Sequence, residues 1–307
     1  MSDPILSIRN VTKGYAGKTA VDAVSLEIPE GIIFGLLGPN GAGKTSLIRM
    51  ITSITAPDSG EIFFRGMPLK ESHMKEMGYM PEERGLYKKM KVGDHLVYLM
   101  RLRGISKVNA WILTNEWLKR LSADEWTNKL VGELSKGMQQ KIQFIATVAH
   151  NPPLLILDEP FSGLDPINAR VIQNEIDRLK KEGTTIIFST HRMEQVEEIC
   201  DRIGLISEGK LVLEDEVNLA RRKYFHNEWA VDFEGDEKVF EGATGFKIVS
   251  LEKGRVLLAL EPGSSSNDLL RFLAGSGLGI LKAEAHMPRL SEIFIEVVSK
   301  QKGVFIG

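Results

Sequence analysis

The 307-residue sequence contains one cysteine, no long apolar run and almost no net charge. A chain whose only cysteine is Cys200 cannot form an internal disulfide, which indicates a reducing compartment. No apolar stretch approaches the roughly 18 residues of a membrane-spanning helix, and the N-terminus lacks the basic-then-apolar pattern of a signal peptide. The formal net charge of −2 gives no overall attraction to nucleic acid or anionic lipid. We therefore expect a cytosolic chain without a nucleic-acid partner, which reaches a membrane only through another protein.

What the sequence does contain is an alternation of strand-like and helix-like segments over residues 1–220. This alternation predicts an α/β fold with a mostly parallel sheet covered by helices on both faces. Between about 91 and 150 the pattern is helical only, with Leu96, Leu99 and Leu102 on one predicted apolar stripe. The predicted strands are 5–8, 23–28, 32–37, 154–157, 184–190 and 202–207, and the helices outside the insert include 167–181.

The composition changes near residue 221, where a basic-aromatic segment gives way to short alternating strands and glycine turns. We expect residues 221–307 to form a separate small α+β domain. Glu252-Lys253-Gly254 predicts a hairpin loop, followed by a helix at 268–274, a strand at 280–285 and a helix at 290–299. The apolar stripe Leu290, Ile293 and Val297 is interpreted as core, and no ligand is predicted for this domain.

A glycine-rich loop connects the predicted strand 32–37 to an amphipathic helix. Its residues Gly38 to Thr45 match G-x-x-x-x-G-K-[ST] in the context that confirms the motif. Such a loop turns backbone N–H groups inward and adds a helix dipole, so it holds polyphosphate. Lys44 can reach the β- and γ-phosphates, and the Thr45 hydroxyl can bind Mg²⁺. The predicted nucleotide contacts are Gly38, Pro39, Asn40, Gly41, Ala42, Gly43, Lys44, Thr45 and Ser46. The loop alone does not distinguish a kinase, a GTPase, a helicase or a transporter motor.

A second buried strand ends in two acids, Asp158 and Glu159. The carboxyl end of a parallel strand lies beside the phosphate loop, where Asp158 can hold Mg²⁺ through water. Glu159 can point at the γ-phosphate and orient or deprotonate the attacking water. These two residues therefore predict hydrolytic chemistry next to the bound phosphates.

The segment Leu134-Ser135-Lys136-Gly137-Met138 narrows the class. Together with the loop and LLILDEP, it resembles the ATP-binding cassette family, whose signature reads LSGGQ. The resemblance implies a P-loop NTPase core at 1–220, with an antiparallel β subdomain and a helical subdomain at about 91–150. It also implies that two cassettes pair head to tail. Ser135, Lys136 and Gly137 of one chain would then contact ATP held by the phosphate loop of the other.

Three further positions match the family in order. Asp165, in Ser162-Gly163-Leu164-Asp165, would contribute to the composite nucleotide site at the partner subunit. His191 would contact the γ-phosphate and hold Glu159 and water in place, and Tyr15 would stack on adenine. The resemblance thus implies an ATPase with Lys44, Glu159 and His191 as catalytic residues, and with ATP and Mg²⁺ as cofactors.

The sequence departs from the family pattern at two places. Glu82 stands where glutamine is usual, in the segment that senses Mg²⁺, and we expect its charge to weaken nucleotide binding in the absence of Mg²⁺. Thr45, Glu82 and Asp158 are the expected metal ligands. Lys136 and Met138 replace the usual glycine and glutamine of the signature, but Ser135 and Gly137 remain, so we still expect a competent site.

The combination PEERGLY, LSKGMQQK and a C-terminal α+β module resembles a bacterial subgroup related to sodium and drug efflux cassettes. That resemblance implies the motor subunit of an exporter at the cytoplasmic face of the bacterial membrane. Its partners would be permease subunits, docked near residues 82–89, and a second ATP-binding subunit. The alternative is a soluble cassette protein acting on ribosomes or DNA. A small-molecule kinase would explain only the loop. The sequence does not identify the cargo.

Overall fold

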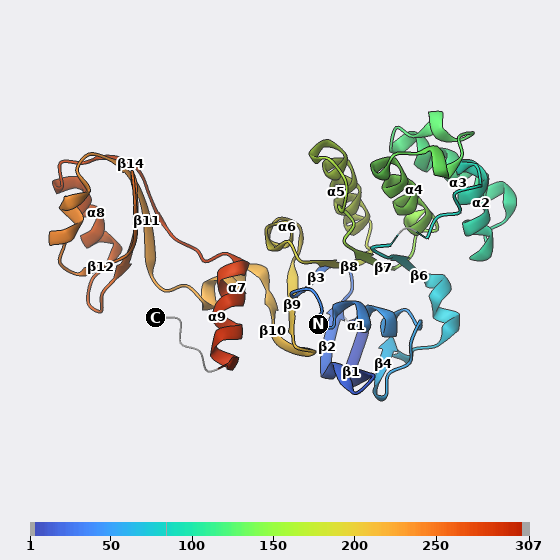
Figure 1. Cartoon of the computed structure of the whole chain (residues 1–307), viewed down its shortest axis with the longest axis horizontal. Helices are drawn as coiled ribbons and strands as arrows, with labels where there is room; N and C mark the ends of the chain where they lie inside the picture. Colours follow the sequence, from blue (N-terminus) through green and yellow to red (C-terminus); the bar gives the residue numbers. More distant parts are fainter. Residues whose placement is uncertain (1–3, 84, 303–307) are drawn as a thin grey trace. The chain divides into compact units, whose positions relative to one another are not determined.

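The computed structural model describes residues 4–83 and 85–302 (Figure 1). Contacts between Cα atoms divide the chain into two compact units. One contains the described residues up to 217 and those from 297 onwards, and the other contains residues 218–296. None of the helices in the described ranges is long and apolar enough to cross a membrane.

The first unit is built on a six-stranded sheet in the order β10-β9-β3-β8-β7-β6 (Figure 1). β9, β3, β8, β7 and β6 run parallel, and only β10 is antiparallel to its neighbour, which confirms the predicted mostly parallel sheet. Every residue of β3, β7 and β8 is buried, as their continuous apolar runs predict for strands covered on both faces. The strands are β3 Ile33–Leu37, β6 Met77–Met80, β7 Leu154–Asp158, β8 Thr185–Thr190, β9 Arg202–Ser207 and β10 Lys210–Glu216.

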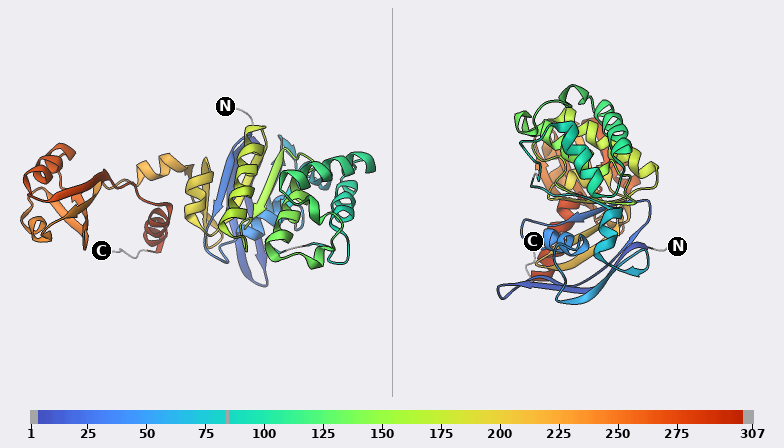
Figure 2. Two further views of the ribbon diagram at one scale, coloured as in Figure 1. Left: turned by 90° about the horizontal axis from the view of Figure 1, so that it is seen from above. Right: turned by 90° about the vertical axis from the view of Figure 1, so that its right-hand side faces the viewer.

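Different elements cover the two faces of this sheet (Figures 1 and 2). On one face, Phe34 and Ile156 join a core with α1 (Lys44–Ile51) and the antiparallel sheet. On the other face, α6 (Met193–Ile199) packs so closely on β3 that a Cβ at Gly35 would lie 2.8 Å from Cγ1 of Val196. α5 (Pro166–Lys181) also lies on this side. The sheet is therefore a buried central layer, as α/β patterning predicts.

The antiparallel sheet has the order β2-β1-β4-β5. Its strands are β1 Pro4–Tyr15, β2 Lys18–Pro29, β4 Ser59–Phe64 and β5 Met67–Pro68. β1 and β2 are much longer than the predicted segments 5–8 and 23–28, because β-bulges interrupt the period-2 alternation on which those predictions depended. The short strands β4, β6 and β10 were missed by the sequence analysis.

The helical subdomain contains α2 (Val92–Leu102), α3 (Lys107–Arg120) and α4 (Lys136–Val148). Short 3₁₀ turns lie at Asp124–Trp126 and Val131–Glu133, and another, Glu71–Glu76, precedes β6. The predicted stripe is wrong at Leu102, which is 61% exposed. The buried face instead follows Val92, Leu96 and Met100, because a spacing of four residues keeps one face of a helix.

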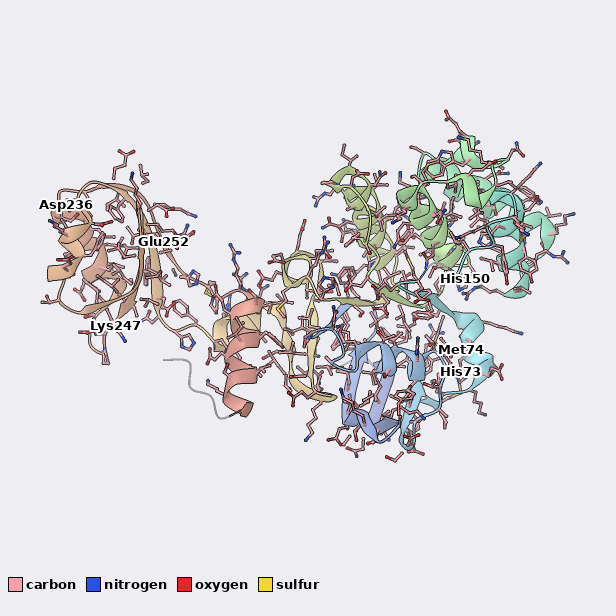
Figure 3. All side chains as sticks on the ribbon, viewed as in Figure 1. His73, Met74, His150, Asp236, Lys247 and Glu252 are labelled. Atoms are coloured by element: carbon pink, nitrogen blue, oxygen red, sulfur yellow. The ribbon has the colours of Figure 1, made fainter. Side chains whose placement is uncertain are left out.

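His150 joins this subdomain to the central sheet, at the junction of α4 with β6 (Figure 3). Its Nε2 lies 2.8 Å from Nη1 of Arg103, which in turn donates to the Met77 carbonyl of β6 at 2.6 Å. Burial, and then the Arg103 charge, lower the pKa of His150 to about 4. A neutral imidazole can accept the hydrogen bond that Arg103 donates.

The second unit is an antiparallel sheet in the order β12-β13-β11-β14, with α8 packed on one face. Its elements are β11 Glu228–Glu234, β12 Phe246–Glu252, β13 Arg255–Leu260, α8 Ser266–Gly275 and β14 Gly279–Ala285, with a 3₁₀ turn at Glu237–Gly242. Glu252 pairs with Arg255, which confirms the predicted hairpin. α7 (Val217–Lys223) precedes this sheet. α9 (Leu290–Lys302) follows it and buries the stripe Leu290, Ile293 and Val297, as predicted.

Candidate functional site

The site is organised by the parallel strands of the central sheet. β3, β8, β7 and β6 are consecutive neighbours, so their carboxyl ends meet at one edge. The phosphate loop follows β3, His191 follows β8, and Asp158 ends β7 with Glu159 directly after it. Glu82 lies two residues beyond β6. We call these residues the strand-edge group.

The phosphate loop has a backbone that only glycine fits at two positions. Gly38 has φ 147°, and a Cβ there would lie 2.2 Å from the Ile206 carbonyl oxygen. Gly43 has φ 114°, and its Cβ would lie 2.3 Å from the carbonyl oxygen of Ala20. The loop is therefore enclosed by backbone on both sides. Gly38, Ala42, Gly43 and Lys44 are buried, Ser46 is half-buried, and Pro39, Asn40, Gly41 and Thr45 are exposed.

Lys44 begins α1 and folds back over the loop. Its Nζ donates to the carbonyl oxygens of Gly38 at 2.6 Å and of Pro39 at 3.1 Å. Burial lowers the pKa of Lys44, while the negative charges of Glu159, Asp158 and Glu82 act in the opposite direction. The ammonium group therefore lies within electrostatic reach of all three carboxylates.

Asp158 is buried, and its Oδ1 accepts a hydrogen bond from Ser189 Oγ at 2.8 Å. Burial raises the pKa of Asp158, and the charges of Glu159 and Glu82 raise it further, against the effects of Ser189 and Lys44. Excess negative charge thus surrounds this carboxylate.

The oxygen atoms of Thr45, Glu82 and Asp158 are hard donors of the kind that Mg²⁺ prefers, and a divalent cation would relieve their excess charge. Within 4–83 and 85–302, no group of three or more His, Cys, Asp or Glu side chains could hold a metal ion by itself. The donor chemistry of Thr45, Glu82 and Asp158 fits Mg²⁺ held together with phosphate oxygens, which is how this ion usually binds.

Glu159 is held by the end of β8. Its Oε2 accepts from Thr190 Oγ1 at 3.1 Å, and its Oε1 accepts from the His191 backbone N–H at 2.9 Å. The imidazole Nδ1 of His191 also lies 2.6 Å from Oε1. Glu159 has φ 51°, a left-handed conformation that costs a residue other than glycine of the order of 1–2 kcal/mol. This conformation turns the residue after β7 so that β8 can bind its side chain.

A second group of predicted residues surrounds the start of α4, and we call it the signature group. Ser135 is the N-cap of α4, and its Oγ accepts from the Met138 N–H at 3.3 Å. A Cβ at Gly137 would lie 3.6 Å from the Leu164 side chain, in the segment that leads to Asp165. Asp165 caps α5 and accepts from the N–H groups of Ile167 and Asn168. Ser135, Lys136 and Asp165 are exposed.

The two groups are not joined by direct polar contacts among the described residues. In the part of the chain that the structure describes, no hydrogen bond or ion pair joins Ser135, Lys136 or Asp165 to the phosphate loop. Tyr15 lies apart from both, at the β1–β2 hairpin, with its ring 41% exposed and Lys13 Nζ 5.7 Å from the ring centroid.

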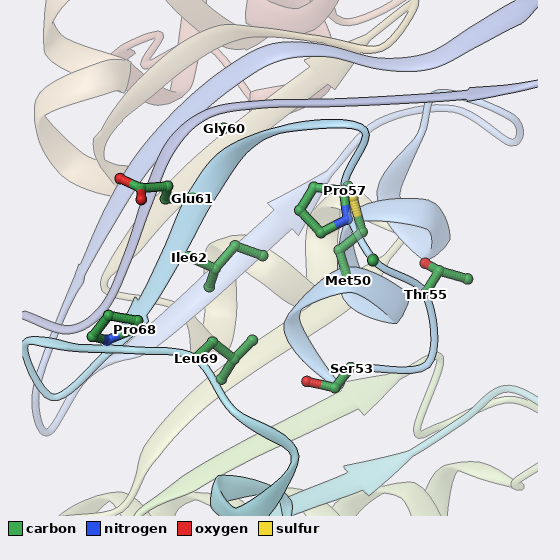
Figure 4. A pocket seen from close by; sticks show the side chains of 10 residues that line it. Met50, Ser53, Thr55, Pro57, Gly60, Glu61, Ile62, Pro68 and Leu69 are labelled. Atoms are coloured by element: carbon green, nitrogen blue, oxygen red, sulfur yellow. The ribbon is translucent and has the colours of Figure 1, made fainter.

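Ser189 and Thr190, which donate hydrogen bonds to Asp158 and Glu159, were not predicted from the sequence. Two hydroxyl residues that end a buried strand directly before His191 were the available signal. A 310 Å³ cavity at the end of α1 and beside β4 lies elsewhere, lined by Met50, Ile62 and Leu69 among others (Figure 4). None of the predicted site residues lines that cavity.

Comparisons with known proteins agree with this geometry. The family model for ABC transporters matches residues 21–162, and the model for the C-terminal domain of DrrA1-3-like ATP-binding proteins matches residues 218–298. The chain is 42% identical over 294 residues to an uncharacterised ABC transporter ATP-binding protein, YhaQ of Bacillus subtilis, covering 96% of this chain and 98% of that protein. It is 31% identical over 303 residues to the bacitracin transport ATP-binding protein BcrA of Enterococcus faecalis, covering 96% of each chain.

Solved structures similar to this chain also include ATP-binding subunits of ABC transporters. A structure described as the ATP-binding subunit of an ABC transporter superposes with a TM-score of 0.67 at 26% identity, covering 72% of this chain and 93% of that one. The nearly complete coverage of relatives above 30% identity, together with the strand-edge group, establishes the family. This chain belongs to the ABC transporter family, as an ATP-binding subunit whose enzymatic activity is ATP hydrolysis.

Proposed function

We propose that this chain is the motor of an exporter and that it hydrolyses ATP as a nucleotide-sandwich dimer. One observation supports the proposal: among the described residues, no hydrogen bond or ion pair joins the exposed Ser135, Lys136 and Asp165 of the signature group to the phosphate loop of the strand-edge group. Two chains arranged head to tail place the signature group of each against the nucleotide on the other. The second subunit is another copy of this chain or a paralogue.

In each site, backbone N–H groups from Gly38 to Ser46 hold the phosphates, and Lys44 neutralises charge on the β- and γ-phosphates. This requires the Lys44 ammonium group to leave the Gly38 and Pro39 carbonyls, which it contacts at 2.6 and 3.1 Å, for the phosphate oxygens. Ser135, Lys136, Gly137 and Asp165 of the opposite chain complete the enclosure. The aromatic face of Tyr15, which is exposed, stacks on adenine.

Glu159 accepts a proton from, or orients, the water that attacks the γ-phosphate. Both of its oxygens are positioned by β8, so the carboxylate is preorganised, and His191 holds it from the side on which phosphate binds. Thr45, Glu82 and Asp158 hold Mg²⁺, which supplies positive charge to the transferred phosphoryl group.

The partners are membrane permease subunits, which dock near residues 82–89 at the cytoplasmic face of a bacterial membrane. Glu82 belongs to the strand-edge group, and Glu83, Gly85 and the residues from Tyr87 to Lys89 are exposed, so docking and metal binding share one segment. Export is supported by the BcrA relative, which is named for bacitracin transport. The alternative of a soluble cassette that acts on ribosomes or DNA is less well supported, because relatives that match almost the whole chain are named as transport proteins.

The experiment is to trap the sandwich. Glu159→Gln keeps the shape of the side chain but removes its basicity, so ATP with Mg²⁺ is expected to convert the variant to a stable dimer, as measured by light scattering during gel filtration. Ser135→Arg in the same background fills the signature surface and is expected to keep the chain monomeric. A Glu159→Gln variant that stays monomeric with saturating ATP and Mg²⁺, or full turnover by the Ser135→Arg single variant, would contradict the proposal.

A further inference from the structure

Three glutamines on α4 each donate a side-chain hydrogen bond to the backbone of a different segment. Nε2 of Gln139 donates to the Leu134 carbonyl at 3.0 Å, within the signature group. Nε2 of Gln140 donates to the Pro160 carbonyl at 3.0 Å, one residue after Glu159. Nε2 of Gln143 donates to the Pro81 carbonyl at 2.8 Å. α4 is thereby hydrogen-bonded to the residue that follows Glu159 and to the residue that precedes Glu82.

Gln143 has the most specific environment of the three. Besides Pro81, its Nε2 lies 3.4 Å from the carbonyl oxygen of Glu83, so one amide group contacts the carbonyls on both sides of Glu82. These two contacts hold the Pro81–Glu82 peptide unit directly before Glu82 and the carbonyl of Glu83 directly after it. They therefore restrict where the Glu82 carboxylate can lie at the edge of the sheet.

The amide of Gln143 is not explained by packing alone. The residue is 4% exposed, and among the described residues its Oε1 has no hydrogen-bond partner. A buried polar atom without a partner destabilises the folded state, and an aliphatic side chain of the same size would avoid that loss. What an amide offers here, and an aliphatic side chain does not, is the pair of Nε2 contacts with the backbone around Glu82.

α4 is a firm support for this contact. It packs against β6 so closely that a Cβ at Gly78 would lie 2.6 Å from the Thr147 carbonyl oxygen. Glu82 follows two residues after this strand, so Gln143 binds the chain just where it leaves the sheet. The residues around Glu82 are thus held by α4 at Pro81 and Glu83 and by the end of β6 before them.

We propose that Gln143 is a positioning residue for Glu82, and that it aligns the carboxylate for Mg²⁺ bound with nucleotide. This inference rests on the proposed role of Glu82 as a metal ligand. Gln143 itself touches neither metal nor nucleotide. Its effect is therefore on how much Mg²⁺ is needed for tight nucleotide binding, and not on binding without the metal.

The test uses Gln143→Met, which keeps the length of the side chain and removes its donors. Affinity for a fluorescent ATP analogue is measured in EDTA and across a Mg²⁺ titration, so that hydrolysis is not the readout. Loss of this positioning is expected to raise the Mg²⁺ concentration at half-maximal tight binding about 5-fold, with affinity in EDTA unchanged. Gln143→Leu carries the same expectation if Gln143→Met fails to fold.

Thr147→Val is the matched control. Thr147 is also 4% exposed and lies one turn further along α4, but its Oγ1 donates only to the Gln143 carbonyl at 2.8 Å, within its own helix. The variant is expected to lower thermal stability without changing the Mg²⁺ requirement. An equal shift in both variants would overturn the inference, because general loosening of α4 would then explain it.

Glu82→Ala separates this inference from the proposed function. If Glu82→Ala leaves the Mg²⁺ requirement unchanged, the role of Glu82 as a ligand is wrong, and the inference fails with it. If Glu82→Ala raises the requirement while Gln143→Met does not, only the positioning role of Gln143 is wrong. If both raise it, the double variant is expected to match Glu82→Ala alone. An additive effect would show that Gln143 acts on something other than Glu82.

Discussion

The imidazole Nδ1 of His191 lies 2.6 Å from Oε1 of Glu159, and the backbone N–H of His191 donates to the same oxygen at 2.9 Å. One residue at the end of β8 thus contacts the carboxylate at the end of β7 twice. The exposed histidine side chain can also face a bound phosphate, whereas Glu159 is largely covered, with 14% of its side chain exposed. The pair links the proposed base to the site of the γ-phosphate.

His191→Ala is expected to lower kcat about 100-fold or more while ATP affinity changes little, because positioned proton transfer contributes on this scale. Steady-state ATPase assays, with binding measured separately in the Glu159→Gln background, check this. The backbone N–H of residue 191 remains in the variant, so the control His191→Gln, which restores a side-chain donor, is expected to recover part of kcat. Equal activity of His191→Ala and the unchanged protein would refute the role of the imidazole.

Glu82→Gln is expected to strengthen nucleotide binding in EDTA about 5-fold, because one negative charge near the phosphates is worth about 1 kcal/mol at a partly exposed site. The Glu82 charge already acts on both Lys44 and Asp158. Titration with ATP at low and high ionic strength measures the effect, which salt should reduce. Glu83→Gln, next to it on the same exposed segment, is the control and is expected to change affinity less.

Stability at acid pH depends on two buried histidines. His95 is fully buried, neither of its ring nitrogens has a hydrogen-bond partner among the described residues, and burial lowers its pKa to about 4. His150 has a pKa of about 4 as well. Because each is depressed below the unfolded value of 6.5, the unfolded chain binds more protons, and stability falls as pH decreases from 6.5 towards 4.

His95→Leu is therefore expected to remove up to about 1.4 kcal/mol of this loss per pH unit in that window. Urea midpoints of the unchanged protein and the variant, compared between pH 7.5 and 4.5, measure it. The two proteins should diverge in favour of His95→Leu below pH 6.5, since His150 still titrates in both. Parallel curves across that window would show that His95 is not buried as a neutral group.

Gly38→Ala is expected to abolish nucleotide binding and to lower stability strongly, because its Cβ would lie 2.2 Å from the Ile206 carbonyl oxygen. Gly41→Ala is the matched control in the same loop. Gly41 also has a positive φ, 79°, but a Cβ there meets nothing within 4 Å, so about 1–2 kcal/mol of backbone strain is its main cost. Thermal unfolding and ATP titration of both variants give the comparison, and equal losses would contradict the enclosed loop.

Much of the fold could be predicted from the sequence because several elements have strong local patterns. β3 and β7 are continuous apolar runs that end at recognisable motifs, so their burial and their common edge followed from the pattern. β6 (MGYM) and β4 (SGEIFF) are short and mixed, and the sheets that contain them form through pairing with distant strands, which local sequence does not encode. Leu102 was assigned to the wrong face because two successive steps of three residues from Leu96 rotate away from the buried face, which continues at Met100.

Some residues of the candidate site could likewise be predicted from the sequence, and others could not. Lys44, Asp158, Glu159 and His191 follow strands, so parallel topology alone gathers them at one edge. Gln143 could not be predicted, because its contact with the Pro81 carbonyl joins residues 62 positions apart and depends on how α4 packs on β6. A glutamine on the buried side of a helix has no sequence signature that distinguishes such a contact from simple burial.

The proposed sharing of each nucleotide site between two chains has a consequence for how activity scales with the amount of protein. When two copies must meet before either can act, the rate in dilute solution rises with the square of chain concentration. Specific activity is then expected to fall on dilution and to become constant only where association is saturated. Any scaffold that holds two copies side by side would raise turnover without altering a single residue of the site.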